Sequence, residues 1–199
     1  FLSEEPDEIR KFFDCPYVDP EPPRQCATNA PLGIENGTPL SIPDESFTAS
    51  SVDIIGTLQS TPSSARLNFK GGLQIDGRIL IGGWKPIDDE TVQSWVQVSL
   101  GRDVIVSGVI TQGRYDTSGH RQHWVTKFKV MYASIEKTTL EAVSKQGGTP
   151  EIFYSNYDGS SEVISMFSQP ILASTIRFVP VEWKTRIVLR FELLGCLKM

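Results

Sequence analysis

Hydrophobic and polar residues alternate along several segments of this chain. Val96, Val98 and Leu100 alternate with polar neighbours, and the same two-residue period runs through 127–132 and 187–194. Successive side chains of a β-strand point to opposite faces, so this period predicts strands with one buried and one outward face. Residues 104–110 are almost all apolar, as expected for a strand that is covered on both sides.

Glycine and proline residues separate these segments, for example at Gly71-Gly72, Gly82-Gly83, Gly147-Gly148 and Pro170. Within the strand-rich region, only residues 138–145 are expected to hold a short helix. Many short strands with turns rich in glycine and proline predict an all-β sandwich or barrel.

The first 25 residues have a different character. Acidic residues within positions 4–8 precede Arg10 and Lys11, an order that suits the dipole of a short helix, and a proline-rich segment follows at 15–23. We therefore expect residues 1–25 to be an N-terminal extension or linker. One domain is expected at 26–196, with a short tail at 197–199.

Composition and charge narrow the function. The chain has 199 residues, of which 39% are hydrophobic and 22% charged, as in ordinary globular proteins. Its net charge of −5 argues against nucleic acid as a partner. The charge does not exclude an anionic membrane, because a few cations can gather on an acidic protein. No apolar run reaches the roughly 18 residues that suggest a transmembrane helix.

The three cysteines bear on the cellular compartment. Cys26 stands just before the strand-rich region and Cys196 just after its last strand, so a bridge between them would close the domain end to end. Such a bridge would reduce the entropy of the unfolded chain and thereby stabilise the folded domain by up to about 5 kcal/mol. The alternative is three free thiols in a cytosolic protein. If Cys26 and Cys196 are bridged, Cys15 is left over and would pair outside this sequence, pair between chains, or stay free. Asn36 opens a glycosylation sequon, which together with the cysteines favours an extracellular location.

A series of short segments occurs along the chain in a particular order. They are Pro31–Gly37, Phe47–Ser51, Ala65–Asn68, Gly82–Trp84, Trp95–Val98, Ile110–Tyr115, Trp124–Phe128, Ile176–Pro180 and Leu189–Cys196. Together they resemble the discoidin domain, also called the coagulation factor V/VIII C-type domain, over about residues 26–196.

The resemblance implies a fold and a way of binding. It implies an eight-stranded jelly-roll-like β-sandwich with its first and last strands side by side and a Cys26–Cys196 disulfide closing its ends. It also implies that ligands bind where three loops project at one end. Cell adhesion, lectin-like glycan binding and phospholipid binding are the implied roles, with no catalytic residues.

The first projecting loop, 52–60, carries aliphatic side chains. Ile54, Ile55 and Leu58 stand where family members that bind phosphatidylserine usually show large aromatics. At an exposed tip, each isoleucine buried among acyl chains would yield roughly 1.5 to 3 kcal/mol.

The second loop, 69–81, is longer than is usual in the family. It offers Leu73 and Ile75, with Arg78 nearby to add about 1 kcal/mol on an anionic surface. Alternatively, the apolar run 79–81 belongs to a strand and fills the core.

The third loop is polar. Arg114, His120, Arg121 and His123 precede an aromatic, a combination that suits sugar hydroxyls or a carboxylate. Trp84, which follows two glycines, fits either the core or the binding site.

Evidence for metals and catalysis is weak. The His120–His123 pair has no third ligand, so no metal site is predicted there. The acidic run 88–90 leaves calcium as a cofactor to test, although a solvated turn is the favoured interpretation. Motifs of hydrolases, zinc proteases and nucleotide-binding loops are absent, so no enzyme is predicted.

These observations predict an extracellular, non-catalytic adhesion or recognition module. Its ligand would be a cell-surface glycan or protein receptor, bound through loops at one end of the fold. The alternatives are an anionic phospholipid membrane, bound by the aliphatic loops, and a targeting role within a larger enzyme. The acidic charge and the absence of large aromatics from the first projecting loop favour the glycan or protein.

Overall fold

The computed structural model describes residues 29–87, 93–115 and 123–198. The strands are β1 (Ala30–Pro31), β2 (Phe47–Ala49), β3 (Ile54–Ile55), β4 (Leu58–Gln59), β5 (Gln74–Ile75), β6 (Arg78–Leu80), β7 (Val96–Gln112), β8 (Trp124–Ala133), β9 (Glu141–Ala142), β10 (Phe153–Tyr154), β11 (Val163–Lys184) and β12 (Arg190–Leu197). Two short 3₁₀ helices are η2 (Asp44–Ser46) and η3 (Pro62–Ala65). None of the helices in these ranges is long and apolar enough to cross a membrane.

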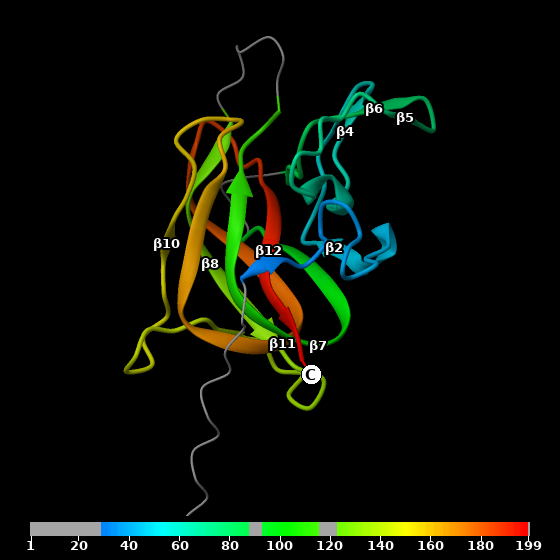
Figure 1. The fold of residues 1–199 in the computed structure, drawn as a ribbon. Helices are drawn as coiled ribbons and strands as arrows, with labels where there is room; N and C mark the ends of the chain where they lie inside the picture. The colour runs from blue at the N-terminus through cyan, green and yellow to red at the C-terminus, as the bar shows by residue number, and fades with distance from the viewer. Residues whose placement is uncertain (1–28, 88–92, 116–122, 199) are drawn as a thin grey trace, which may run out of the picture.

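Eight strands form the main sheet. Their order is β1-β12-β7-β11-β8-β10, with β2 also paired to β7 and β9 to β8. The long strands β7 and β11 bend, so that β11 pairs first with β7 and then, from Thr175 onward, also with β8 (Figure 1). The sheet thereby folds over its own core as a jelly-roll-like sandwich, which confirms the predicted fold class. Ala30 of β1 lies opposite Gly195 of β12, so the first and last described strands are neighbours, as predicted.

The core follows the alternation seen in the sequence. Val96, Val98 and Leu100 are buried, as are Val130 and its neighbour Phe128. Phe128 packs on Phe178 at 5.5 Å between ring centroids, and Phe178 stacks on Phe191 at 4.2 Å. These rings link the two layers of the sandwich through its centre.

The predicted helix at 138–145 is wrong. This segment instead contains β9, which pairs with β8 at Met131 and Tyr132. The backbone N–H of Val143 donates to the carbonyl of Val130, and the Val143 side chain is buried. Burial of Val143 against the sheet therefore outweighs the weak helical preference of its neighbours.

The predicted outward face of β12 is also wrong. Arg190 and Glu192 are each only 1% exposed. Two chain segments cover this face: the N–H groups of Ile34 and Glu35 donate to the Glu192 carboxylate, and the Arg190 guanidinium donates to the carbonyl of Phe69. Alternation in the strand alone does not reveal that segments distant in the sequence cover the second face.

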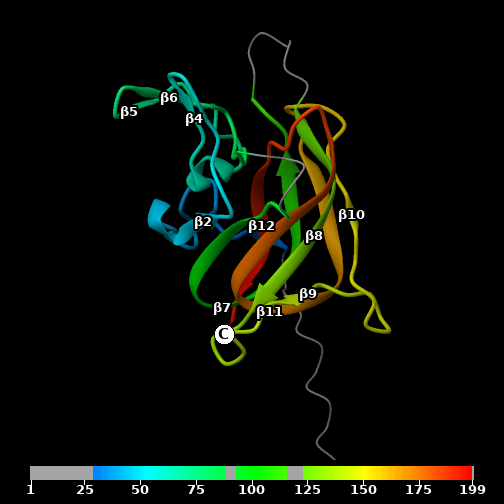
Figure 2. The ribbon, with the colours of Figure 1, turned by 180° about the vertical axis from the view of Figure 1, so that it is seen from behind.

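Four short strands form a separate small sheet in the order β3-β4-β6-β5. Two hairpins, β3–β4 and β5–β6, are joined by parallel pairing of Leu58 with Ile79 and of Gln59 with Leu80. Figures 1 and 2 show this small sheet beside one end of the sandwich. The first two predicted loops are therefore one paired unit.

Candidate ligand-binding site

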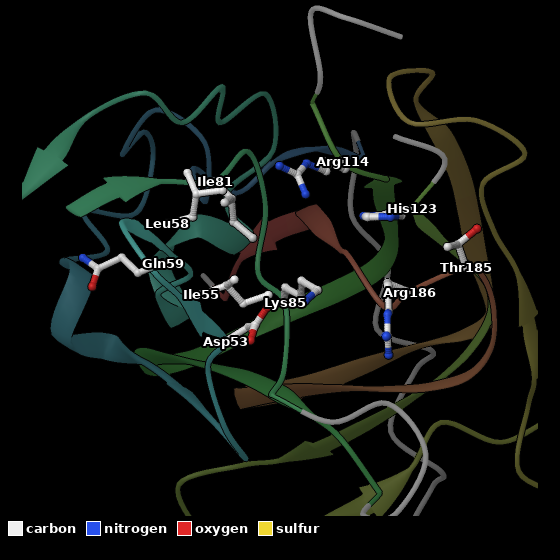
Figure 3. A pocket seen from close by; sticks show the side chains of 10 residues that line it. All are labelled: Asp53, Ile55, Leu58, Gln59, Ile81, Lys85, Arg114, His123, Thr185 and Arg186. Carbon is white, nitrogen blue, oxygen red and sulfur yellow. Dashed lines mark hydrogen bonds and ion pairs between the residues drawn. The ribbon is translucent and has the colours of Figure 1, made fainter. Parts of the chain in front are cut away.

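A pocket of about 370 Å³ lies between the small sheet and the end of the sandwich (Figure 3). Ile55, Leu58 and Ile81 line it from the small sheet and the segment that follows β6. Arg114 and His123 line it from the sandwich, where β7 ends and β8 begins. This volume falls within the range of pockets that hold small ligands.

An ion pair anchors the small sheet beside the pocket. Asp53, just before β3, pairs with Lys85, and both side chains are about 10% exposed and line the cavity. Backbone contacts reinforce the pair, because the N–H of Asp53 donates to the carbonyl of Lys85 at 2.9 Å. Ser60 accepts the N–H of Lys85 at 2.8 Å through its hydroxyl. The base of the β3–β4 hairpin is therefore fixed to the chain that leaves β6.

The Gly82-Gly83-Trp84 segment packs closely against the residues that precede β12. A Cβ on Gly83 would lie 2.5 Å from Val188 Cγ1, and Gly83 has a φ of +140°, which favours glycine. Trp84 and Leu189 exchange backbone hydrogen bonds of 3.1 Å. The glycine thus lets the segment lie directly against the chain that enters β12.

Trp84 belongs to the core and not to the pocket. Its side chain is 0% exposed, and its indole N–H donates to the carbonyl of Ser51 at 3.0 Å. Of the two interpretations of Trp84, the structure supports the core, and the assignment of Trp84 to ligand binding is corrected. Burial of so large an apolar ring outweighs any gain from exposing it.

Arg114 and His123 form the stem of the polar third loop. The N–H of Arg114 donates to the carbonyl of His123 at 2.9 Å, so the two residues face each other across the loop. Their side chains both line the pocket (Figure 3). His120 and Arg121, which the sequence placed in the same site, lie outside the described residues.

The turn between β11 and β12 supplies two more lining residues, Thr185 and Arg186. Thr185 has a φ of +60°, a conformation that β-branched residues rarely adopt. The N–H of Arg186 donates to the carbonyl of Lys184 at 2.7 Å, which closes this tight turn. Strained residues of this kind cluster at functional sites.

The aliphatic residues predicted at the loop tips are exposed. Ile54, Ile55, Leu73 and Ile75 have exposed fractions of 48%, 63%, 60% and 43%, and Arg78 is exposed beside them. Leu58 is half-buried in the pocket wall. Within the apolar run 79–81, Leu80 and Ile81 are buried and Ile79 is half-buried. The alternative that this run serves the core therefore holds for Leu80 and Ile81.

Sequence reasoning missed Asp53, Lys85 and Arg186 as lining residues. None of them stands in a motif, and they meet only because the small sheet folds back onto the sandwich. It also missed Arg190, whose guanidinium donates to the carbonyls of Gly113 and Gly159 at 2.7 and 2.9 Å.

Arg190 supports the pocket indirectly, through its hydrogen bond to Gly113. Burial lowers its pKa to about 10, with a smaller opposing effect from Tyr115. Because Arg190 holds the carbonyl of Gly113, it fixes the residue directly before Arg114.

Several predicted features lie partly or wholly outside the described residues. Cys196 is disulfide-bonded, but both candidate partners, Cys15 and Cys26, fall outside the described residues, so the Cys26–Cys196 pairing stays a prediction.

The acidic run 88–90 also falls outside the described residues, and calcium binding there stays a prediction. In the described ranges, no three His, Cys, Asp or Glu side chains are placed to hold a metal ion. Asn36 is exposed and accepts hydrogen bonds from Thr38, while its glycosylation stays a prediction.

Comparison with known proteins settles the family. A family model described as the F5/8 type C domain matches residues 46–193. The chain belongs to this family, the discoidin domains. The match falls within the predicted domain at 26–196, whose exact limits remain a prediction.

Relatives and solved structures agree with this assignment. Retinoschisin from Takifugu rubripes is 36% identical over 176 residues, which cover 87% of this chain and 57% of that protein. Lactadherin from Rattus norvegicus is 35% identical over 169 residues, which cover 83% of this chain and 36% of that protein. Discoidin II from Dictyostelium discoideum shares the fold with a TM-score of 0.59 at 22% identity, over 75% of this chain and 53% of the other. The chain thus spans little more than half of these relatives, or less.

Proposed function

We propose that this discoidin domain is a non-catalytic, extracellular recognition module that binds a cell-surface glycan in the pocket between the small sheet and the sandwich. The observation that carries the proposal is the composition of that pocket. Arg114, His123 and Arg186 supply polar hydrogen-bonding groups on one side, and Ile55 and Leu58 supply an apolar surface on the other. Sugars need both, because a pyranose has polar edges and a less polar face.

Contacts around the pocket hold its walls in place before a ligand binds. The Asp53–Lys85 pair fixes one wall of the pocket. Close packing of Gly83 on Val188 and the hydrogen bond from Arg190 to Gly113 fix the neighbouring segments. A largely preformed site of this kind loses little freedom on binding. The disulfide at Cys196 supports an oxidising, extracellular environment.

The proposal is tested with a glycan array and a variant that fills the pocket. Leu58→Trp enlarges a half-buried side chain on the pocket wall and should abolish the glycan signal. Ile135→Trp is the matched control, because Ile135 is 59% exposed just beyond the far end of β8. Equal signals from the two variants, with both folded, would remove the pocket from glycan binding.

A second candidate is attachment to an anionic membrane through the small sheet. Four exposed aliphatic side chains, Ile54, Ile55, Leu73 and Ile75, lie on one paired unit with Arg78 among them. Most of an exposed patch of this kind would be buried among acyl chains. Each side chain would then contribute roughly 1.5 to 3 kcal/mol of favourable binding free energy.

Vesicle binding tests the second candidate. The variant Ile54→Asp with Ile55→Asp should lose binding to vesicles containing phosphatidylserine by more than tenfold. The matched control changes Ile135 and Ile152, two exposed isoleucines outside the small sheet, to Asp. Membrane attachment by the small sheet is excluded if both double variants bind vesicles like the parent domain.

A further inference from the structure

An apolar patch lies on the side of the sandwich away from the small sheet. Its four side chains, Ile152, Tyr154, Ile164 and Met166, have exposed fractions of 44%, 75%, 61% and 44%. The first two lie in or beside β10 and the other two in β11, and the hydroxyl of Ser165 donates to the carbonyl of Tyr154 at 3.2 Å between the two segments. Figures 1 and 2 both show β10 on the side of the sandwich opposite the small sheet. Single exposed apolar residues are ordinary, but a contiguous group commonly marks a contact surface.

The patch is the bare end of a sheet face that is covered elsewhere. Glu192 of β12, Ile110 of β7 and Ile164 of β11 lie in one row across the three strands. Glu192 is 1% exposed because the segment of Ile34 lies over it, and Ile110 is 8% exposed because Leu67 packs on it. The loops that cover this outer face therefore end before they reach β11.

Cys196 lies on the same outer face. It stands opposite Ile105 of β7, whose neighbours Val104 and Val106 are fully buried in the core. Because side chains alternate along a strand, Ile105 and Cys196 point outward. Strands spaced about 4.8 Å apart, with a rise of about 3.3 Å per residue, place Met166 roughly 12 Å from Cys196.

The disulfide at Cys196 attaches the N-terminal residues to this face. Cys15 and Cys26 are the other two cysteines of the chain, so one of them is the partner. A span of roughly 12 Å needs only about four extended residues. The residues that precede either cysteine can therefore reach the patch.

The sequence of these N-terminal residues supplies a matching surface. Ile9, Phe12 and Phe13 occur at the i, i+3, i+4 spacing of one helix face, within the segment whose order of charges suits a short helix. A helix of this length is marginal alone and gains most of its stability by burying its apolar face. The expected helix thus needs an apolar surface, and the patch offers one within its reach.

Charge favours this segment over a second copy of the chain as the occupant. Glu151 and Glu162 immediately precede the two parts of the patch, and Lys127 beside it is already ion-paired. Two copies of the patch placed face to face would bring these acids together, which is unfavourable. Arg10 and Lys11, which stand among the apolar positions of the N-terminal segment, have the opposite charge.

We propose that the N-terminal segment packs Ile9, Phe12 and Phe13 onto the apolar patch formed by β10 and β11. The disulfide at Cys196 gives the segment a high effective concentration at this face, so a modest apolar contact is sufficient to hold it. The docked segment extends the cover of the outer face to β11. It lies on the side opposite the small sheet and leaves the pocket open.

Methionine oxidation tests the contact in the full chain. Hydrogen peroxide transfers an oxygen atom to an accessible methionine thioether and leaves water, so the rate at Met166 reports whether the patch is covered. We expect Met166 of the parent to oxidise about fivefold more slowly than in the variant Phe12→Ser with Phe13→Ser. The control variant Phe1→Ser with Leu2→Ser should oxidise like the parent. Peptide mass spectrometry measures the rates.

Limited proteolysis gives a reciprocal test from the side of the patch. Ile164→Asp should release the segment and speed tryptic cleavage after Arg10 or Lys11 about fivefold, because cleavage follows the population of the open form. Ile135→Asp is the matched control, since Ile135 is 59% exposed, against 61% for Ile164, but lies beyond the end of β8. It should leave the cleavage rate unchanged.

Several results would overturn the proposal. Equal oxidation of Met166 in the parent and the Phe12 and Phe13 variant, or equal cleavage of the two aspartate variants, would show that the segment does not cover the patch. Protection of Met166 that is lost on dilution and does not depend on Phe12 and Phe13 would assign the patch to a second copy of the chain. Met131, half-buried on β8, should oxidise at one rate in every variant and so confirms an intact fold.

Discussion

Arg190 and Glu192 are charged side chains that face away from the central core of the sandwich and are nevertheless buried. Arg190 donates to the carbonyls of Phe69, Gly113 and Gly159, so one guanidinium joins three loops. These loops include the residue before Arg114, which lines the pocket. At the scale of the residue, therefore, the proposed binding site depends on a side chain that does not itself line the pocket.

The variant Arg190→Lys keeps the charge but cannot reach three carbonyls at once. Because buried carbonyls are then left without donors, we expect the free energy of unfolding to fall by about 3 kcal/mol. Urea denaturation measures this loss. The control is Arg186→Lys at the pocket, which should change stability by less than about 0.5 kcal/mol. Equal stability of Arg190→Lys and the parent would contradict the role assigned to Arg190.

Burial raises the pKa of the Glu192 carboxyl above its ordinary value of 4.5, although N–H groups of Glu35, Ile34, Leu193 and Gly33 favour the charged form. The folded state therefore holds its proton to higher pH than the unfolded state. The contribution of Glu192 to stability is greatest below pH 4.5 and declines as the pH rises through the raised pKa.

The variant Glu192→Gln tests this sign. The difference in free energy of unfolding between the parent and the variant should shift in favour of the parent as the pH falls from 7 toward 4.5. Denaturation curves at several pH values provide the measurement. A difference that is constant with pH, or that shifts toward the variant on acidification, would refute the raised pKa.

At the scale of the element, the Gly82-Gly83 segment and the small sheet determine where the pocket forms. The sequence marked both glycines as a turn and identified the apolar loop residues, and Ile54, Ile55, Leu73 and Ile75 are indeed exposed. It could not show that strands β4 and β6 pair in parallel, because partners 21 residues apart leave no local signal. For the same reason Asp53 and Lys85 were not recognised as partners.

Gly83→Ala should destabilise the domain by about 3 kcal/mol, because the new Cβ would lie 2.5 Å from Val188 Cγ1 and φ is +140°. Gly148→Ala is the matched control, since Gly148 has a φ of +83° but no atom within 4 Å of an added Cβ. It should cost only about 1 kcal/mol of backbone strain. Thermal unfolding compares the two variants. Equal losses would show that the close approach at Gly83 is unimportant.

At the scale of the whole molecule, the order of segments in the sequence was sufficient to predict the fold. The eight-stranded sandwich and the adjacent first and last strands were both expected, and the F5/8 type C match confirms the family. The ligand was less predictable, because it depends on loops that vary freely on one scaffold. Trp84 illustrates the limit: a tryptophan after two glycines suits a binding site as well as a core until its burial is known.

Binding in the pocket between the small sheet and the sandwich can be located by hydrogen–deuterium exchange. The exchange of the domain is measured with and without the tightest glycan from the array. Ligand bound in this pocket should slow exchange in peptides that contain 53–59, 81–85, 114–115 and 185–186, and should leave exchange unchanged at the opposite end around 134–137 and 145–150. Protection confined to that opposite end, or to the outer face of β11, would contradict the assignment of the site.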